Sequence, residues 1–148
     1  MDATSPTATK PPTWYRVGSW LLFTWMLLGV LSFLNSEFMS AEATAALPQE
    51  IQDLMAATPM WMRVMYGVAT LSGFVGGLGL VVRKAWSLPL LVGSLVAVVL
   101  QMGYWLFGMG AMEALGSGAA GMPSVVIILG AFGVWFAMTA KKRGVIVG

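Results

Sequence analysis

The side chains best suited to polar chemistry are one amide, two tyrosines and one pair of opposite charges. Gln101 lies inside a long apolar segment, where an amide is costly unless it is hydrogen-bonded. Tyr104 follows it by three residues and shares its helical face, while Glu37, Arg63 and Tyr66 stand near the same predicted membrane boundary. These five residues form a candidate pocket for a small polar ligand, open to the outer side of the membrane.

A purely structural interpretation of Gln101 is simpler, and the sequence favours it. The amide would form a hydrogen bond to Tyr66, Thr70 or a backbone carbonyl of a neighbouring helix and so lock two helices together. Glu37 and Arg63 would then be ordinary charges at the membrane surface. The pocket and the lock remain alternatives at this point.

The sequence offers no visible machinery for catalysis. The chain contains neither histidine nor cysteine, which removes the commonest general base, the usual haem ligand and every thiolate. No nucleophile stands beside a plausible base, and the acidic residues lack the spacing of metal ligands. We therefore expect no catalytic residue, no cofactor and no metal site, and a protein that is not an enzyme.

Methionine is abundant near the predicted outer ends of the helices. Flexible filling of irregular gaps explains this enrichment, whereas a thioether site for copper(I) is the functional alternative. The residues concerned are Met60, Met62, Met65, Met102, Met109 and Met112.

The elements that position these side chains follow from the composition. Of 148 residues, 58% are hydrophobic and 9% charged, and the mean hydropathy is +0.82, so a bilayer is the natural solvent. The sequence predicts an all-α membrane protein, a four-helix transmembrane bundle with a short amphipathic helical segment in its first outer loop. The predicted helices cover residues 15–34, 59–82, 87–109 and 123–140, within a transmembrane domain of residues 14–143 between cytoplasmic tails at 1–13 and 144–148. A cleaved signal peptide is the less favoured interpretation of the first apolar run.

The first outer loop contains residues typical of helix starts. Ser40 is a plausible N-cap for a first short helix, and Pro48 suits the first turn of a second one that places Leu54 on its apolar face. Thr58 and Pro59 are typical of the N-cap and first residue of the following transmembrane helix.

The second transmembrane helix carries a face almost free of side chains, formed by Ala69, Gly73, Gly76 and Gly77. Small residues at such spacing let helices approach closely in lipid, where van der Waals contact decides packing. We expect an internal helix-packing seam, with a dimer interface or a ligand passage as alternatives. Gly130 and Gly133 form a shorter small-residue face on the fourth helix, which predicts packing of this helix beside the second or the first.

Orientation follows from the distribution of lysine and arginine. Arg63 stands on the predicted outer side, and the other basic residues stand on the side of the two termini, so both termini are expected in the cytoplasm. These residues are Lys10, Arg16, Arg83, Lys84, Lys141, Lys142 and Arg143.

Several segments together resemble a known family. They are SAEATAALPQEIQDLMAATPMW at 40–61, RKAWSLPL at 83–90, VLQMGY at 99–104 and MPSVVIILG at 122–130. The chain is similar, over roughly residues 20–143, to small bacterial four-helix membrane proteins of uncharacterised function that often carry the label "sugar transporter". The resemblance implies the fold and a bacterial inner membrane, and it implies no catalytic residue or cofactor.

Two functions remain from the sequence. The favoured one is a non-catalytic accessory or interaction subunit of a membrane assembly, with the lipid bilayer and other membrane subunits or a second copy as partners, and no nucleic acid. The alternative is a small carrier for a polar solute such as a sugar, working as an oligomer. The carrier is less favoured because no charge lies deep in any predicted helix.

Overall fold

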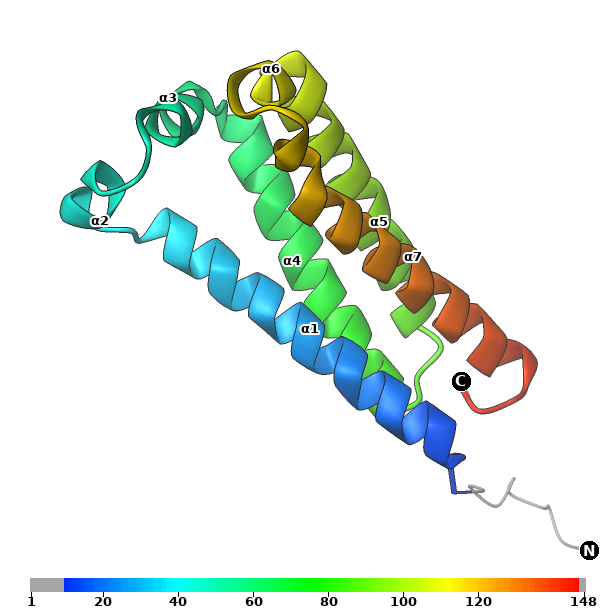
Figure 1. Cartoon of the computed structure of the whole chain (residues 1–148). Coiled ribbons are helices and arrows are strands. Elements are labelled where there is room, and N and C mark those ends of the chain that lie inside the picture. Colours follow the sequence, from blue (N-terminus) through cyan, green and yellow to red (C-terminus); the bar gives the residue numbers. More distant parts are fainter. Residues whose placement is uncertain (1–9, 147–148) are drawn as a thin grey trace, which may run out of the picture.

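The computed structural model describes residues 10–146, and all its long elements are helices (Figure 1). In this part of the chain four helices are long and apolar enough to cross a membrane, so the chain has the build of a multi-pass membrane protein. They are α1 (Thr13–Glu37), α4 (Met60–Val81), α5 (Ser87–Gly103) with the π-helical turn η1 (Tyr104–Gly108), and α7 (Gly121–Lys142). The predicted all-α four-helix fold class is confirmed.

Short elements connect the spans at one end of the bundle. Between α1 and α4 lie α2 (Ala41–Ala45) and α3 (Gln49–Ala57), and between η1 and α7 lie α6 (Ala111–Leu115) and the 3-10 turn η2 (Ser117–Ala120). Ser40 caps α2 as predicted, because its Oγ accepts a hydrogen bond from the Ala43 N–H at 3.1 Å.

The prediction that Thr58 caps the second transmembrane helix is wrong. Its hydroxyl instead donates to the carbonyl of Leu54 at 2.8 Å, and Thr58 closes α3. A threonine hydroxyl can satisfy a carbonyl one turn back in its own helix, and here that bond takes the place of the cap. Pro59, in an extended conformation, is then the last residue before α4.

The spans pack as a row, in which α1 lies on α4, α4 on α5 and α5 on α7 (Figure 1). The first and last helices of the row, α1 and α7, meet at one end and diverge towards the other, where α2 and α3 bridge the gap (Figure 1). The bundle is therefore closed at one end and splayed at the other.

The closed end holds the hydrophobic core. The Tyr15 ring stacks on Phe136 with centroids 5.3 Å apart, which joins α1 to α7, and the Tyr15 hydroxyl donates to the carbonyl of Leu80 in α4. Val145 and Ile146 fold back and are buried in the same cluster. Three helices and the C-terminal segment are thus fastened together at this end.

The two tails follow the predictions only in part. Thr13 already belongs to α1, and Val145 is held in the core, where its carbonyl accepts a hydrogen bond from Arg83 Nε at 2.8 Å. Residues 1–9 and 147–148, which belong to the predicted tails, lie outside the described residues.

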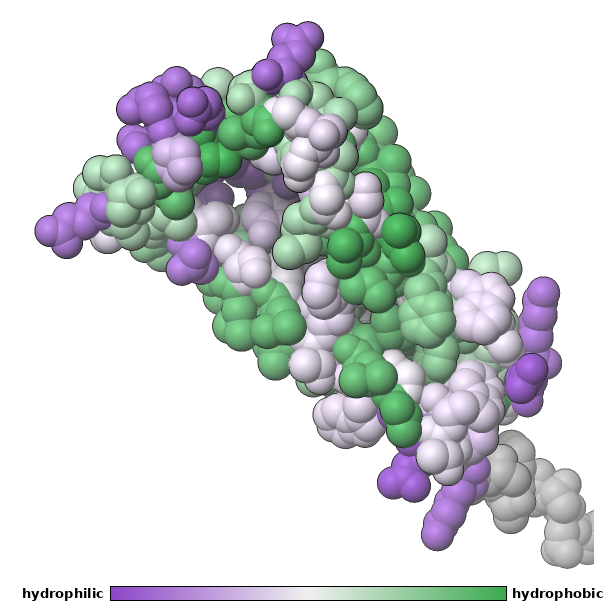
Figure 2. Space-filling view, viewed as in Figure 1, coloured by the Kyte–Doolittle hydropathy of each residue, from purple (hydrophilic) through white to green (hydrophobic). Residues whose placement is uncertain are grey.

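Charge and apolar surface separate along the bundle (Figure 2). Large apolar side chains such as Leu21, Leu31 and Ile128 are more than half exposed on the helix exteriors, where lipid tails can cover them. The closed end carries Arg83, Lys84 and the basic residues that end α7, and we name it the basic end. The splayed end carries the acidic residues of the described chain, and we name it the acidic end; they are Glu37, Glu42, Glu50, Asp53 and Glu113.

Candidate functional site

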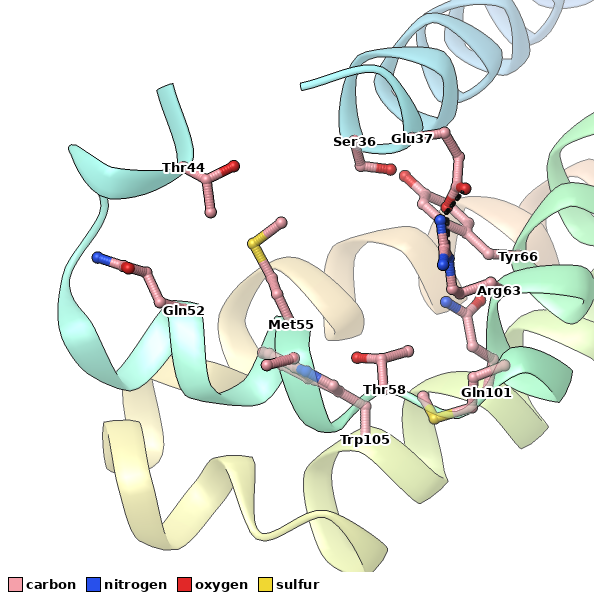
Figure 3. Close-up of a pocket in the computed structure, with 12 residues that line it drawn as sticks. Ser36, Glu37, Thr44, Gln52, Met55, Thr58, Arg63, Tyr66, Gln101 and Trp105 are labelled. Atoms are coloured by element: carbon pink, nitrogen blue, oxygen red, sulfur yellow. Dashed lines mark hydrogen bonds and ion pairs between the residues drawn. The ribbon is translucent and has the colours of Figure 1, made fainter. Parts of the chain in front are cut away.

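A cavity of about 450 Å³ opens at the acidic end beneath α2 and α3 (Figure 3). Because α1 leaves the bundle there, α2 and α3 must span the gap, and the space below them is lined from α1, α2, α3, α4, α5 and the start of η1. We name it the outer cavity. Its lining residues are Ser36, Glu37, Thr44, Gln52, Met55, Ala56, Thr58, Met62, Arg63, Tyr66, Gln101 and Trp105.

The outer cavity contains one ion pair. Arg63 Nε donates to Glu37 Oε1 at 3.1 Å, and the second guanidinium contact joins Arg63 Nη2 to Glu37 Oε2, so the planar guanidinium meets both carboxylate oxygens. This pair links the last turn of α1 to the first turn of α4. Each charge neutralises the other, and the cavity lining carries no net charge from its acidic and basic side chains.

Gln101 stands at the floor of the outer cavity without the partner that the sequence predicts. Its Oε1 is buried and accepts no hydrogen bond from any residue between 10 and 146. The Thr70 hydroxyl donates instead to the carbonyls of Tyr66 and Gly67 in its own helix, at 3.0 and 3.2 Å. In the described part of the chain no hydrogen bond joins the Gln101 side chain to Tyr66, Thr70 or a backbone carbonyl, so the predicted interhelical bond is wrong; the Thr70 proton is used within its own helix.

Tyr66 and Tyr104 take different positions. Tyr66 is partly buried, lines the outer cavity and packs edge-on against Phe33 of α1 with centroids 5.2 Å apart. Tyr104 does not line it, but packs against Trp61 at 4.9 Å, with 41% of its surface exposed. At 100° per residue, Trp105 comes closer to the face of Gln101 than Tyr104 does, and Trp105 takes the place in the cavity. The structure brings four of the five predicted pocket residues together and leaves Tyr104 outside.

The small-residue face of α4 lies at contacts with two helices, and its four residues are buried. A Cβ on Gly73 would come 2.8 Å from Met26 Sδ in α1 and 2.9 Å from Ser94 Oγ in α5. The Ser94 hydroxyl donates to the carbonyl of Ala69 at 2.6 Å, an interhelical bond that the close approach permits.

The other two glycines extend these contacts in both directions. A Cβ on Gly77 would lie 3.3 Å from the Phe23 Cα of α1, and one on Gly76 would lie 3.0 Å from Leu91 of α5. The small-residue face of α4 thus packs against both α1 and α5.

The two glycines of α7 contact different helices. Gly130 faces Leu95 of α5, where an added Cβ would approach to 3.0 Å, while Gly133 faces Leu22 of α1. Of the two predicted neighbours, the first transmembrane helix is confirmed at Gly133. The second is wrong for these positions, because α5 lies between α4 and α7 in the row.

A second cavity, of about 420 Å³, lies between the helices and adjoins the first. We name it the inter-helix cavity. It shares Tyr66 and Gln101 with the outer cavity, and its lining is otherwise mainly apolar. Its lining residues are Trp25, Met26, Leu28, Gly29, Ser32, Tyr66, Ala69, Thr70, Ser94, Val98, Gln101, Met102, Met122 and Val126.

The lining of the two cavities is suited to binding by hydrogen bonds and apolar contact. Within residues 10–146 no three His, Cys, Asp or Glu side chains come together as a metal site would require. Met62 lines the outer cavity and Met102 the inter-helix cavity, while Met60 is 69% exposed. These methionines are therefore divided among different surfaces.

Sequence reasoning missed the residues that α2 and α3 bring to the outer cavity, such as Thr44, Gln52 and Met55. Gln52 holds the connection between these helices, because its Nε2 donates to the carbonyl of Leu47 at 2.8 Å. Nothing local in the sequence shows where the two short helices fold. Trp105 did carry a signal, because it follows Gln101 by one helical turn.

Comparison with protein-family models, curated proteins and solved structures gave no match.

Proposed function

We propose that this chain is a non-catalytic accessory subunit of a bacterial inner-membrane assembly, and that it binds a ligand in its outer cavity without transporting it. One observation carries the proposal: the outer and inter-helix cavities lie towards the acidic end, and the packed core of Tyr15, Leu80 and Phe136 separates them from the basic end.

The proposed orientation places the basic end in the cytoplasm. Lysine and arginine flanking the spans favour the cytoplasmic side, and these residues gather at that end of the bundle. The outer cavity then opens away from the cytoplasm, and both termini lie inside. The bacterial inner membrane comes from the family resemblance of the sequence.

The chemistry of the cavity supports binding rather than turnover. Glu37 and Arg63, its acidic and basic side chains, are hydrogen-bonded to each other, so neither is poised as a general acid or base. Gln101 presents a buried acceptor, which suits recognition of a donor on a ligand.

The surface of α1 supports the subunit role. Of its 25 residues, Tyr15, Ser19 and Leu22 are buried, and these lie near the basic end. Away from its contacts with α4, the helix presents exposed apolar side chains that lipid or a partner helix can cover, such as Leu27, Leu31 and Leu34.

The second candidate is the carrier for a polar solute, and the outer cavity is the observation that favours it. A carrier must also open its site to the opposite side. Here such opening would have to break the Tyr15 to Leu80 hydrogen bond and separate Tyr15 from Phe136. We therefore place the carrier second.

Gentle extraction at native expression level, followed by sizing and identification of co-purifying chains, tests the proposal. We expect stoichiometric recovery with other membrane subunits, and no solute uptake when the chain alone is placed in liposomes. A lone monomer or homodimer that takes up sugar would refute the accessory role. Reporter fusions at the C-terminus and, as the matched control, within the loop at Ser117 should report opposite sides of the membrane.

A further inference from the structure

The outer and inter-helix cavities meet at Tyr66 and Gln101, which line both. One contains an ion pair and several hydroxyl and amide groups, and the other is lined mainly by apolar side chains. A polar compartment thus leads directly into an apolar one. A ligand that fills both must itself have a polar and an apolar part.

The junction of the two cavities holds a hydrogen-bond acceptor without a partner. Gln101 Oε1 is buried and has no partner among the described residues, and a buried acceptor without a partner is costly. The nearby Thr70 hydroxyl is already engaged with carbonyls of its own helix. When the Gln101 amide turns towards the cavity that it lines, a hydroxyl or amino group of a ligand head would satisfy this acceptor.

The charge of the outer cavity selects against an anionic head. Arg63, its basic side chain, already meets both oxygens of the Glu37 carboxylate. An anionic head would have to displace Glu37 or lie beside it, and unpaired like charges repel. The lining therefore complements a head that carries no net charge.

The inter-helix cavity suits an acyl chain. Its walls include Trp25, Leu28, Val98 and Val126, together with methionines whose flexible side chains adapt to an irregular chain. The contacts of α1 with α7 lie near the basic end, and the helices diverge beyond them (Figure 1). Figure 2 shows the molecule hollowed below the α2 and α3 segment, on the face where the two helices separate. Lipid surrounding the spans can reach this opening sideways.

We propose that the joined cavities bind one membrane lipid whose head has no net charge and carries hydrogen-bond donors. The head lies in the outer cavity with a donor on Gln101 Oε1, and an acyl chain lies in the inter-helix cavity. This inference rests on the proposed binding role of the outer cavity and adds the chemical class of the ligand.

Native mass spectrometry of the full chain in mild detergent tests the proposal with three probes. Monooleoylglycerol has an uncharged head with two hydroxyls, methyl oleate has the same chain without a donor, and dioleoylphosphatidylglycerol has an anionic head. We expect one monooleoylglycerol per chain, and affinities lower by about tenfold for the other two, equivalent to about 1.4 kcal/mol. Equal affinity for monooleoylglycerol and methyl oleate would overturn the role of the head.

Paired variants locate the acyl chain. Val126→Phe fills the inter-helix cavity, whereas Val125→Phe adds the same ring to the neighbouring residue, which is 45% exposed on the outside of α7. Val126→Phe should weaken monooleoylglycerol binding by about tenfold, and Val125→Phe should not change it. Circular dichroism and melting of the two variants control for folding.

Two further variants test the head site. Gln101→Leu removes the acceptor and should weaken monooleoylglycerol binding by about tenfold. Glu37→Gln frees the Arg63 guanidinium and should shift the preference towards dioleoylphosphatidylglycerol.

The outcomes separate this inference from the proposed function. Loss of binding in Gln101→Leu but not in Val126→Phe would mean that the ligand is a polar molecule without a chain in the inter-helix cavity. Unchanged binding in both variants would mean that lipid attaches to the outer surface of the helices. Either result overturns the proposal, while co-purification of partner subunits, measured without any probe, would still support the accessory role.

Discussion

Replacing Gly73 with alanine would place a methyl group where three helices meet. The added carbon would lie 2.8 Å from Met26 Sδ in α1 and 2.9 Å from Ser94 Oγ in α5. Met26 ends in a flexible thioether and can move aside. Ser94 is held by its hydrogen bond to the Ala69 carbonyl, at 2.6 Å, so the substitution must push α5 away or break this bond.

The expected destabilisation is the sum of two effects. Overpacking of a tight contact costs about 1–3 kcal/mol. Loss of an interhelical hydrogen bond in a membrane protein adds about 0.6 kcal/mol on average. The total is roughly 1.5–3.5 kcal/mol, before any gain from the higher helix propensity of alanine, which is at most about 1 kcal/mol.

Gly93→Ala is the matched control that removes the propensity contribution. Gly93 lies inside α5, and a Cβ there would meet no atom within 4 Å. We expect the free energy of unfolding of Gly73→Ala to be lower than that of Gly93→Ala by roughly 1.5–3.5 kcal/mol, measured by reversible unfolding in mixed micelles with dodecyl sulfate. If the two variants unfold at the same denaturant concentration, α4 does not pack against α1 and α5 at Gly73 and the seam is wrongly placed.

Three further substitutions test other contacts by the same unfolding measurement. Tyr15→Phe removes the hydroxyl that donates to the Leu80 carbonyl and should cost about 1 kcal/mol; no loss would mean that this bond does not fasten the basic end. Gly18→Ala would drive a Cβ into the Phe136 ring and should destabilise by about 1–3 kcal/mol, whereas unchanged stability would contradict the contact of α1 with α7. Gln101→Leu should cost nothing, because its Oε1 has no partner to lose, and a loss near 2 kcal/mol would restore the interhelical lock.

The helices could be predicted because they follow from local physics. Apolar runs of about 20 residues must be helical in lipid, where each backbone N–H and C=O needs an internal partner. Helix ends were less predictable, since they depend on competition between neighbours. Thr58 has the residue type of an N-cap for α4, yet its hydroxyl is taken by the carbonyl of Leu54.

In the candidate site, too, some residues could be predicted from the sequence and others could not. Glu37, Arg63, Tyr66 and Gln101 could be grouped from the sequence, because antiparallel spans bring their predicted depths together. The part of the lining that α2 and α3 contribute could not be predicted, because the positions of these two short helices are set by how far α1 diverges from α7. That divergence is a tertiary property, and no spacing in the sequence encodes it.

Gly73, Gly76 and Gly77 illustrate what a pattern reveals and what it leaves open. Their spacing predicted close helix contacts, and each lies against a neighbouring helix. The pattern did not identify the neighbours, because α1 and α5 both approach the same glycine face. Because α1 and α5 cover this face of α4, α7 packs on α5 along its length and on α1 near the basic end.

The outer cavity reaches Gln101 from the acidic end and is closed towards the basic end. The chain contains no cysteine, so a single Gln101→Cys substitution gives one thiol, and Leu100→Cys gives a matched thiol on the lipid-facing side of α5, where Leu100 is 56% exposed. A membrane-impermeant maleimide should label Gln101→Cys in right-side-out vesicles, leave it unlabelled in inverted vesicles, and leave Leu100→Cys unlabelled in both. Equal labelling of the two thiols, or labelling of Gln101→Cys from the cytoplasmic side, would contradict the claim.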